Sequence, residues 1–110
     1  MTYNTVGPRH FEYFATRLVD GAGIRRDDFV LDAATGTGAV LASAAPKLGP
    51  TGHILGIDLN ASMLRRAAAL VDQTSLRNVE LKLGDAEHLE LGTATVDVVL
   101  CIRNLWLQKT

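Results

Sequence analysis

Apolar residues recur along the chain at two spacings, one helical and one extended, and the two alternate. From Phe11 to Val19 the apolar positions fall on one face of a helix. Phe29 to Ala33 is a short apolar run that leads into a glycine-rich loop, which predicts a strand. The alanine-rich stretch from Gly38 to Lys47 follows and predicts a second helix. The first half of the chain is therefore predicted to run helix, strand, loop and helix.

The second half repeats this order. His53 to Ile57 predicts a second strand, and Asn60 is a suitable N-terminal cap for the helix that follows it. Val79 to Leu83 alternates apolar with charged residues, whereas Val96 to Ile102 is almost continuously apolar, as in a strand buried on both faces. Strands that alternate with helices predict an α/β fold with a doubly wound parallel sheet.

Length and composition limit the number of domains and the classes of partner. The chain has 110 residues, 47% hydrophobic and 21% charged, which indicates one domain over 1–110, with a helical segment at 1–24 and a β/α core at 25–110. A net charge of −1 gives no indication of a nucleic-acid partner. Cys101 is the only cysteine, and we expect neither a disulfide nor a metal site. We find no apolar leader and no run long enough to span a membrane, so we expect a cytoplasmic protein.

The loop after the first predicted strand carries the most information about chemistry. Asp32 lies in this strand near its carboxyl end, and Gly36 and Gly38 lie in the loop before the next helix. In a doubly wound sheet, ligands bind beside the carboxyl ends of the strands, and glycine lets the backbone approach them closely. The alternative is a tight strand-to-helix turn that binds no ligand.

Asp32 separates two candidate cofactors. A nicotinamide dinucleotide would place its pyrophosphate at the helix N-terminus, where this carboxylate would repel it, and its glycine motif would need a glycine at Leu41. S-adenosylmethionine carries a sulfonium and an ammonium group, which a carboxylate attracts. Asp58 follows Gly38 by 20 residues, a position from which an acid accepts hydrogen bonds from ribose hydroxyls. Alone, Asp58 could equally be an ordinary strand-end or helix-cap residue; together with Asp32 and the loop it favours ribose binding.

Four segments resemble the motifs of class I S-adenosylmethionine-dependent methyltransferases, most closely the ubiquinone/menaquinone-biosynthesis-like branch. They are residues 30–40 for the first motif, 56–64 for the second strand, 84–87 for the third motif, and 96–105 for the fourth strand and the turn after it. Four motifs in the right order are far more specific than any one of them. The resemblance covers nearly the whole chain and implies a Rossmann-like fold that binds S-adenosylmethionine.

The resemblance implies cofactor contacts residue by residue. The methionine part of the cofactor would lie among Asp32, Ala34, Gly36, Thr37 and Gly38. Ala34 replaces the glycine that many relatives carry, which adds one methyl group and would weaken the close approach of the backbone at most.

Other positions have implied contacts with the rest of the cofactor. Asp58 would hold the ribose, Leu59 and Met63 would pack on the adenine, Asp85 and the Ala86 amide would bond the adenine ring, and Ile102 would meet the amino-acid end. The alternative for Met63 is a core residue on a helix face, and the alternative for Asp85 is a plain Gly-Asp turn. Residues 3–4 resemble the family's cofactor-covering segment only weakly.

The chain departs from the family after the fourth strand. Relatives continue with a helix, a fifth strand and an antiparallel hairpin, which usually supply much of the acceptor pocket. The resemblance therefore implies a sheet truncated after the fourth strand, with Val96 to Ile102 at its edge. An apolar edge strand favours pairing with another chain, so we expect a homodimer or self-association through this edge.

The sequence names no catalytic base. His88 lies nearest the expected cofactor, although an isolated histidine is more often a surface or structural residue. Arg103, Asn104 and Trp106 are candidates for an acceptor site, and the alternative for Trp106 is a core residue. The first hypothesis is a methyltransferase, or its cofactor-binding fragment, that acts on a small-molecule acceptor. The alternative is a non-catalytic module of the same fold that binds only cofactor or a partner.

Overall fold

The computed structural model describes residues 3–33, 35–85, 96–101 and 106–109, with residues 3–12 and 106–109 described by their backbone. The strands are β1 (Phe29–Ala33), β2 (His53–Asp58), β3 (Val79–Leu83), β4 (Val98–Cys101) and β5 (Trp106–Lys109). The helices are α1 (Tyr3–Ala22), α2 (Ala39–Ala44) with the short 3₁₀ turn η1 (Ala45–Lys47), and α3 (Ala61–Gln73).

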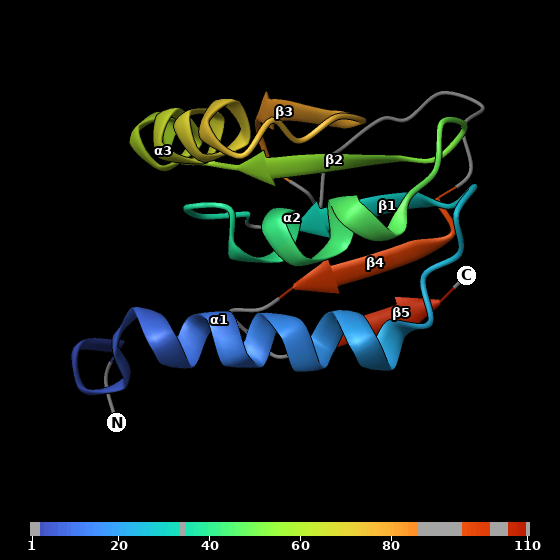
Figure 1. Cartoon of the computed structure of the whole chain (residues 1–110). Coiled ribbons are helices and arrows are strands. Elements are labelled where there is room, and N and C mark those ends of the chain that lie inside the picture. Colours follow the sequence, from blue (N-terminus) through green and yellow to red (C-terminus); the bar gives the residue numbers. More distant parts are fainter. Residues whose placement is uncertain (1–2, 34, 86–95, 102–105, 110) are drawn as a thin grey trace.

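The described strands form one sheet in the order β3-β2-β1-β4-β5 (Figure 1). The pairs β1–β2, β2–β3 and β1–β4 are parallel, which confirms the predicted Rossmann-like α/β class. Since β1 lies between β2 and β4, the chain moves outward from β1 in one direction and then crosses to its other side. Ligands bind at this kind of reversal in open α/β sheets.

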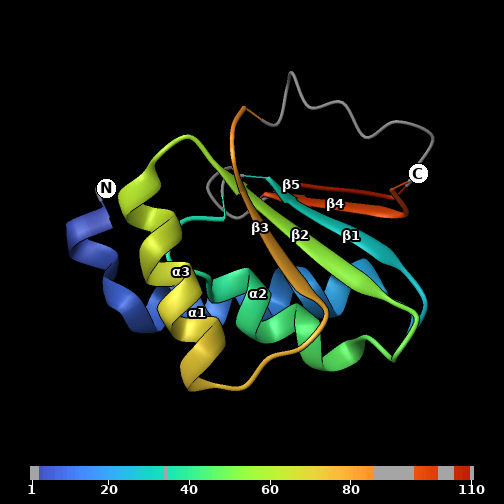
Figure 2. The same cartoon turned by 90° about the horizontal axis from the view of Figure 1, so that it is seen from above.

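All three described α-helices lie on the same face of the sheet (Figure 2). Their apolar faces pack against the strand residues that point the same way, such as Val30, Ile54 and Leu100, all 0% exposed. Strand residues on the opposite face form a smaller cluster around Leu31, Leu55 and Ile57. The alternation of the two clusters along β1 and β2 follows from the two-residue period of a strand, and it explains why apolar residues lie on both faces of these strands.

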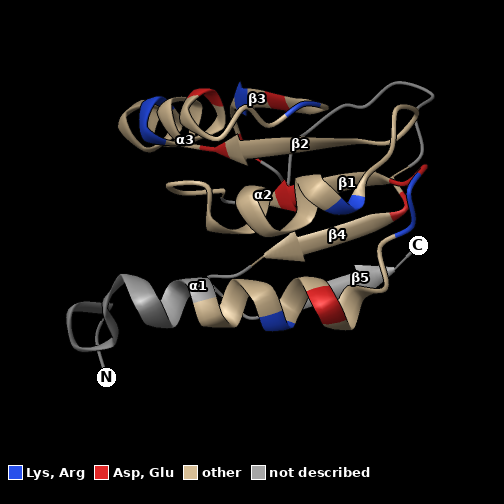
Figure 3. Cartoon of the chain, in the orientation of Figure 1, with Lys and Arg blue, Asp and Glu red and all other residues tan. Residues whose placement is uncertain are grey.

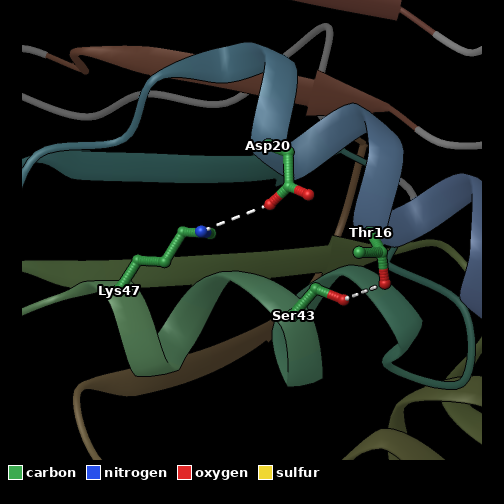
Figure 4. A network of polar contacts seen from close by, with 4 residues as sticks. All are labelled: Thr16, Asp20, Ser43 and Lys47. Carbon is green, nitrogen blue, oxygen red and sulfur yellow. Dashed lines mark hydrogen bonds and ion pairs between the residues drawn. The ribbon is translucent and has the colours of Figure 1, made fainter.

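Polar contacts accompany the packing of α1 on α2 and η1 (Figure 4). Lys47 Nζ lies 3.3 Å from Asp20 Oδ1, and the hydroxyls of Thr16 and Ser43 lie 3.4 Å apart. Both members of the ion pair are substantially exposed, so the pair contributes little free energy. Burial of apolar side chains of α1, such as Ala15 and Val19, therefore matters more for holding these elements together than the ion pair does.

The prediction that the fourth strand forms the edge of the sheet is wrong. β5 pairs with β4 antiparallel, and Leu100 lies opposite Leu107 in this pairing. Backbone groups on the outer side of β4 are therefore bonded to the chain's own next segment. This pairing removes the reason for expecting self-association through the edge of β4.

Candidate cofactor-binding site

Two loops that are distant in sequence are joined at the carboxyl ends of β1 and β2. The Thr35 amide donates to the Ile57 carbonyl over 2.7 Å, and the Gly36 amide donates to Asp58 Oδ2 over 2.9 Å. The parallel register places Ala33 beside Ile57, so both strands end at the same level. Acidic residues mark these two strand ends in Figure 3. The pairing therefore brings the glycine loop and Asp58 together, as the sequence predicts.

Asp58 organises the end of β2. Its Oδ1 accepts from the Asn60 amide over 2.9 Å, and its own carbonyl accepts from the Gly84 amide over 2.9 Å. Thus one residue contacts the loop after β1, the start of α3 and the segment that follows β3. The residue as a whole is 8% exposed, and each carboxylate oxygen can accept more than one hydrogen bond.

Asp32 is fully buried beneath the loop. Its Oδ2 accepts from the Thr35 hydroxyl over 2.5 Å, and its Oδ1 accepts no hydrogen bond from any described residue. Burial raises the pKa of Asp32 from 3.8 to about 7; the Thr35 hydrogen bond opposes this rise, and the charge of Asp58 adds to it. A carboxyl with a pKa near neutrality is one whose charge a nearby ligand can change.

The two loop glycines adopt conformations that other residues avoid. Gly36 has φ +58° and Gly38 has φ +99°, both in the left-handed region. A Cβ on Gly36 would meet no atom of the described residues within 4 Å, so these residues leave open space beside it. At Gly38 a Cβ would lie 3.0 Å from Leu70 Cδ2, which shows how closely the start of α2 approaches α3.

The predicted adenine contacts lie at the start of α3 and the end of β3. Leu59 directly follows the buried strand β2 and is 73% exposed. Met63 and Asp85 are half-buried, and Thr37 is exposed in the loop. These residues lie close in sequence to Gly36, Asn60 and Gly84, which hydrogen-bond Asp58, and their cofactor roles stay predictions.

Several predicted residues lie outside the described part of the chain. They are Ala34, Ala86, Ile102, His88, Arg103 and Asn104. Trp106 is described only by its backbone, in β5. His53 lies at the amino end of β2, where its ring stacks on Phe29 with centroids 4.1 Å apart. It is therefore at the opposite end of the strand from the glycine loop.

Thr35 is the residue that sequence analysis missed. It is 3% exposed, and both its hydroxyl and its amide are hydrogen-bonded. Its position three residues after Asp32, within the loop, was the available signal, because Ser and Thr hydroxyls commonly bond to nearby groups in turns.

An open cleft of about 550 Å³ lies at the amino ends of the strands. Its lining includes Arg26, Gly49, Pro50, Leu76, Arg77 and Asn78. Within the described ranges, no cluster of His, Cys, Asp and Glu could hold a metal ion, and no helix is both long and apolar enough to cross a membrane.

Comparison with known proteins identifies the family. A family model described as "Methyltransferase domain" matches residues 30–110, which include the glycine loop, Asp58 and all five strands apart from the first residue of β1. The chain belongs to the class I S-adenosylmethionine-dependent methyltransferases. The resemblance inferred from four sequence motifs is thereby confirmed.

Two curated relatives of this chain are methyltransferases, one named as an O-methyltransferase and the other as a C-methyltransferase. The chain is 36% identical over 97 residues to a nocamycin O-methyltransferase of Saccharothrix syringae, covering 88% of this chain and 35% of that protein. It is 38% identical over 82 residues to a ubiquinone/menaquinone biosynthesis C-methyltransferase of Pseudomonas fluorescens, covering 74% of this chain and 32% of that protein. The chain thus spans about a third of the length of each of these two curated relatives.

A solved structure agrees with the fold of this methyltransferase domain. A SAM-dependent methyltransferase from Aquifex aeolicus superposes with a TM-score of 0.75 at 26% identity, over 89% of this chain and 53% of that one. The parallel core of β3, β2, β1 and β4 is therefore the family's arrangement rather than a feature of this sequence alone.

Proposed function

We propose that this chain binds S-adenosylmethionine at the carboxyl edge of β1 and β2, as the cofactor-binding part of a small-molecule methyltransferase. The observation that carries the proposal is the hydrogen bond from the Gly36 amide to Asp58 Oδ2. It joins the glycine loop to the acid at the end of β2, which are the two features that the cofactor needs in one place.

The chemistry of the residues suits the parts of this cofactor. Asp58 has acceptor capacity left after its two backbone bonds, so ribose hydroxyls can donate to it. The open space beside Gly36 admits the methionine part close to the backbone. The buried Asp32 supplies a negative charge when ionised, which favours the sulfonium and ammonium groups. Exposed Leu59 and half-buried Met63 offer apolar surface to the adenine.

Methyl transfer places modest demands on the protein. The sulfonium methyl is already activated, so catalysis consists mainly of holding donor and acceptor in line. The names of the two curated relatives point to small organic molecules, nocamycin and the quinones, and we propose an acceptor of that class. For the acceptor site we propose only a region, the carboxyl edge of the sheet.

Calorimetric titration tests the proposed cofactor. The chain should bind S-adenosylmethionine and S-adenosylhomocysteine but not NAD. Asp58→Ala should weaken binding of both adenosyl ligands by roughly 10-fold to 100-fold, because hydrogen bonds to a charged group are lost. Asp27→Ala is the matched control, since Asp27 is exposed and lies at the amino end of β1. Equal affinity of the Asp58 and Asp27 variants would contradict the assignment of the ribose site.

Methyl turnover, measured separately, would distinguish an enzyme from a module that only binds cofactor.

A further inference from the structure

Thr35 is held in place from two sides. Its amide donates to the Ile57 carbonyl of β2 and its hydroxyl donates to Asp32 Oδ2 of β1. Gly56 of β2 makes room for it, because a Cβ on Gly56 would lie 2.9 Å from Thr35 Oγ1 and 3.1 Å from Thr35 Cβ. The hydroxyl therefore has a fixed position, directed at a buried carboxyl and with little freedom to turn elsewhere.

We propose that Thr35 is a positioning residue that holds Asp32 beneath the cofactor loop, and that Asp32 releases its proton when the cationic cofactor binds. This inference rests on the proposed function, since it requires S-adenosylmethionine to bind beside the loop. The step is a simple ionisation: the Asp32 O–H bond breaks, the electron pair stays on the carboxylate, and the proton goes to the solvent.

The surroundings of Asp32 favour its protonated form when no cofactor is bound. Its Oδ1 accepts no hydrogen bond from described residues, and an uncompensated buried carboxylate is costly. On β2 the ionisable group that acts on it is Asp58, whose negative charge disfavours a second one. On β4 the neighbouring ionisable side chain is the buried Cys101 thiol, and α2 carries none. Thr35 on the loop supplies a hydrogen bond but no charge.

A bound cation reverses this balance. A sulfonium or ammonium group at the loop attracts the carboxylate form, in an environment where charges interact more strongly than in water. Burial already raises the pKa of Asp32 to about 7, so the gain from the cation is enough to release the proton near neutral pH. The Thr35 hydroxyl adds to the effect because it hydrogen-bonds the ionised form.

Variants at Thr35 separate this role from a merely structural one. Thr35→Val keeps the shape of the side chain but removes the donor, so Asp32 should retain its proton to higher pH. Thr35→Ser keeps the hydroxyl and should behave as the wild type. Asp32→Asn removes the ionisable group, so its affinity for the cofactor should no longer change with pH in the way the wild type does.

The experiment is calorimetric titration of the full chain with S-adenosylmethionine between about pH 6 and 8.5, in buffers of different ionisation enthalpy. Wild-type affinity should rise by up to roughly tenfold per pH unit below neutrality and level off above it, with proton release on the acid side. For Thr35→Val the curve of affinity against pH should move to higher pH. At the alkaline end of the range its affinity should equal that of the wild type. An affinity loss that is equal at every pH would overturn the proposal, as would a wild-type curve without pH dependence.

A second measurement keeps the two proposals apart. Titration of the Asp32 carboxyl carbon by ¹³C NMR in the empty chain should give a higher midpoint for Thr35→Val than for the wild type and Thr35→Ser. Equal midpoints would refute the role of Thr35 whatever the chain binds. If the folded wild type bound no adenosyl ligand at any pH, the proposed function and the proton release would both fail. Binding without proton release would refute only the further inference.

Discussion

Asp32 affects the stability of the fold as well as the chemistry of the site. Its pKa is raised in the folded chain to about 7, above the value of 3.8 expected for an unfolded one. Between these two values the unfolded chain has lost the proton while the folded chain keeps it, so stability falls as pH rises. Below about pH 4 the stabilising effect is fully present, and above neutrality it has been lost.

Asp32→Asn should remove this dependence on pH. The free energy of unfolding of the variant, minus that of the wild type, should increase between about pH 4 and 7 and then stay constant. The increase should amount to a few kcal/mol, with about 4 kcal/mol as the upper bound for a shift of this size. Urea unfolding followed by circular dichroism at several pH values measures the difference. Two parallel stability curves would show that the carboxyl ionises alike in both states.

The roles of single residues were predictable where they depend on neighbouring residues in the sequence. Asp32 and Asp58 stand out because each lies at or near the end of an apolar run, next to a loop or a cap. The burial of Asp32 and the contacts of Thr35 were not predictable, because they require Gly56, which is 21 residues from Thr35, to leave space on the neighbouring strand. Such packing depends on strand register, which the sequence does not specify locally.

At the scale of elements, the sequence predicted the N-terminal cap of α3. Asn60 Oδ1 accepts from the amides of Ser62 over 2.8 Å and Met63 over 3.2 Å, which confirms the predicted cap. Asn60→Ala should destabilise the fold by about 1 kcal/mol because these amides lose their partner. Asn60→Ser retains a capping oxygen and should cost much less. Thermal unfolding of the three chains compares them, and an equal loss in both variants would argue against the cap.

The remaining elements show where sequence patterns lose information. β1, β2 and β3 were predicted to within one residue at each end, because their apolar periods are bounded by polar or glycine residues. The fourth strand begins at Val98 rather than Val96. β5 was not predicted, since four residues of mixed character carry no period, and only their pairing with β4 makes them a strand.

At the scale of the whole molecule, β5 determines which edge the sheet presents beyond β4. Both strands are four residues long, but β4 is apolar and largely buried, whereas β5 ends in Gln108 and Lys109. Short edge strands and edge lysines are common means of preventing pairing between chains.

Removing residues 106–110 should therefore expose β4 and cause self-association at micromolar concentrations where the full chain does not associate through this edge. Light scattering on both chains tests this, after circular dichroism has shown that the shorter chain folds. Adding Val99→Lys to the shorter chain should reduce its association by placing a charge on the exposed strand. If both chains had the same mass per particle, β5 would not be what protects β4.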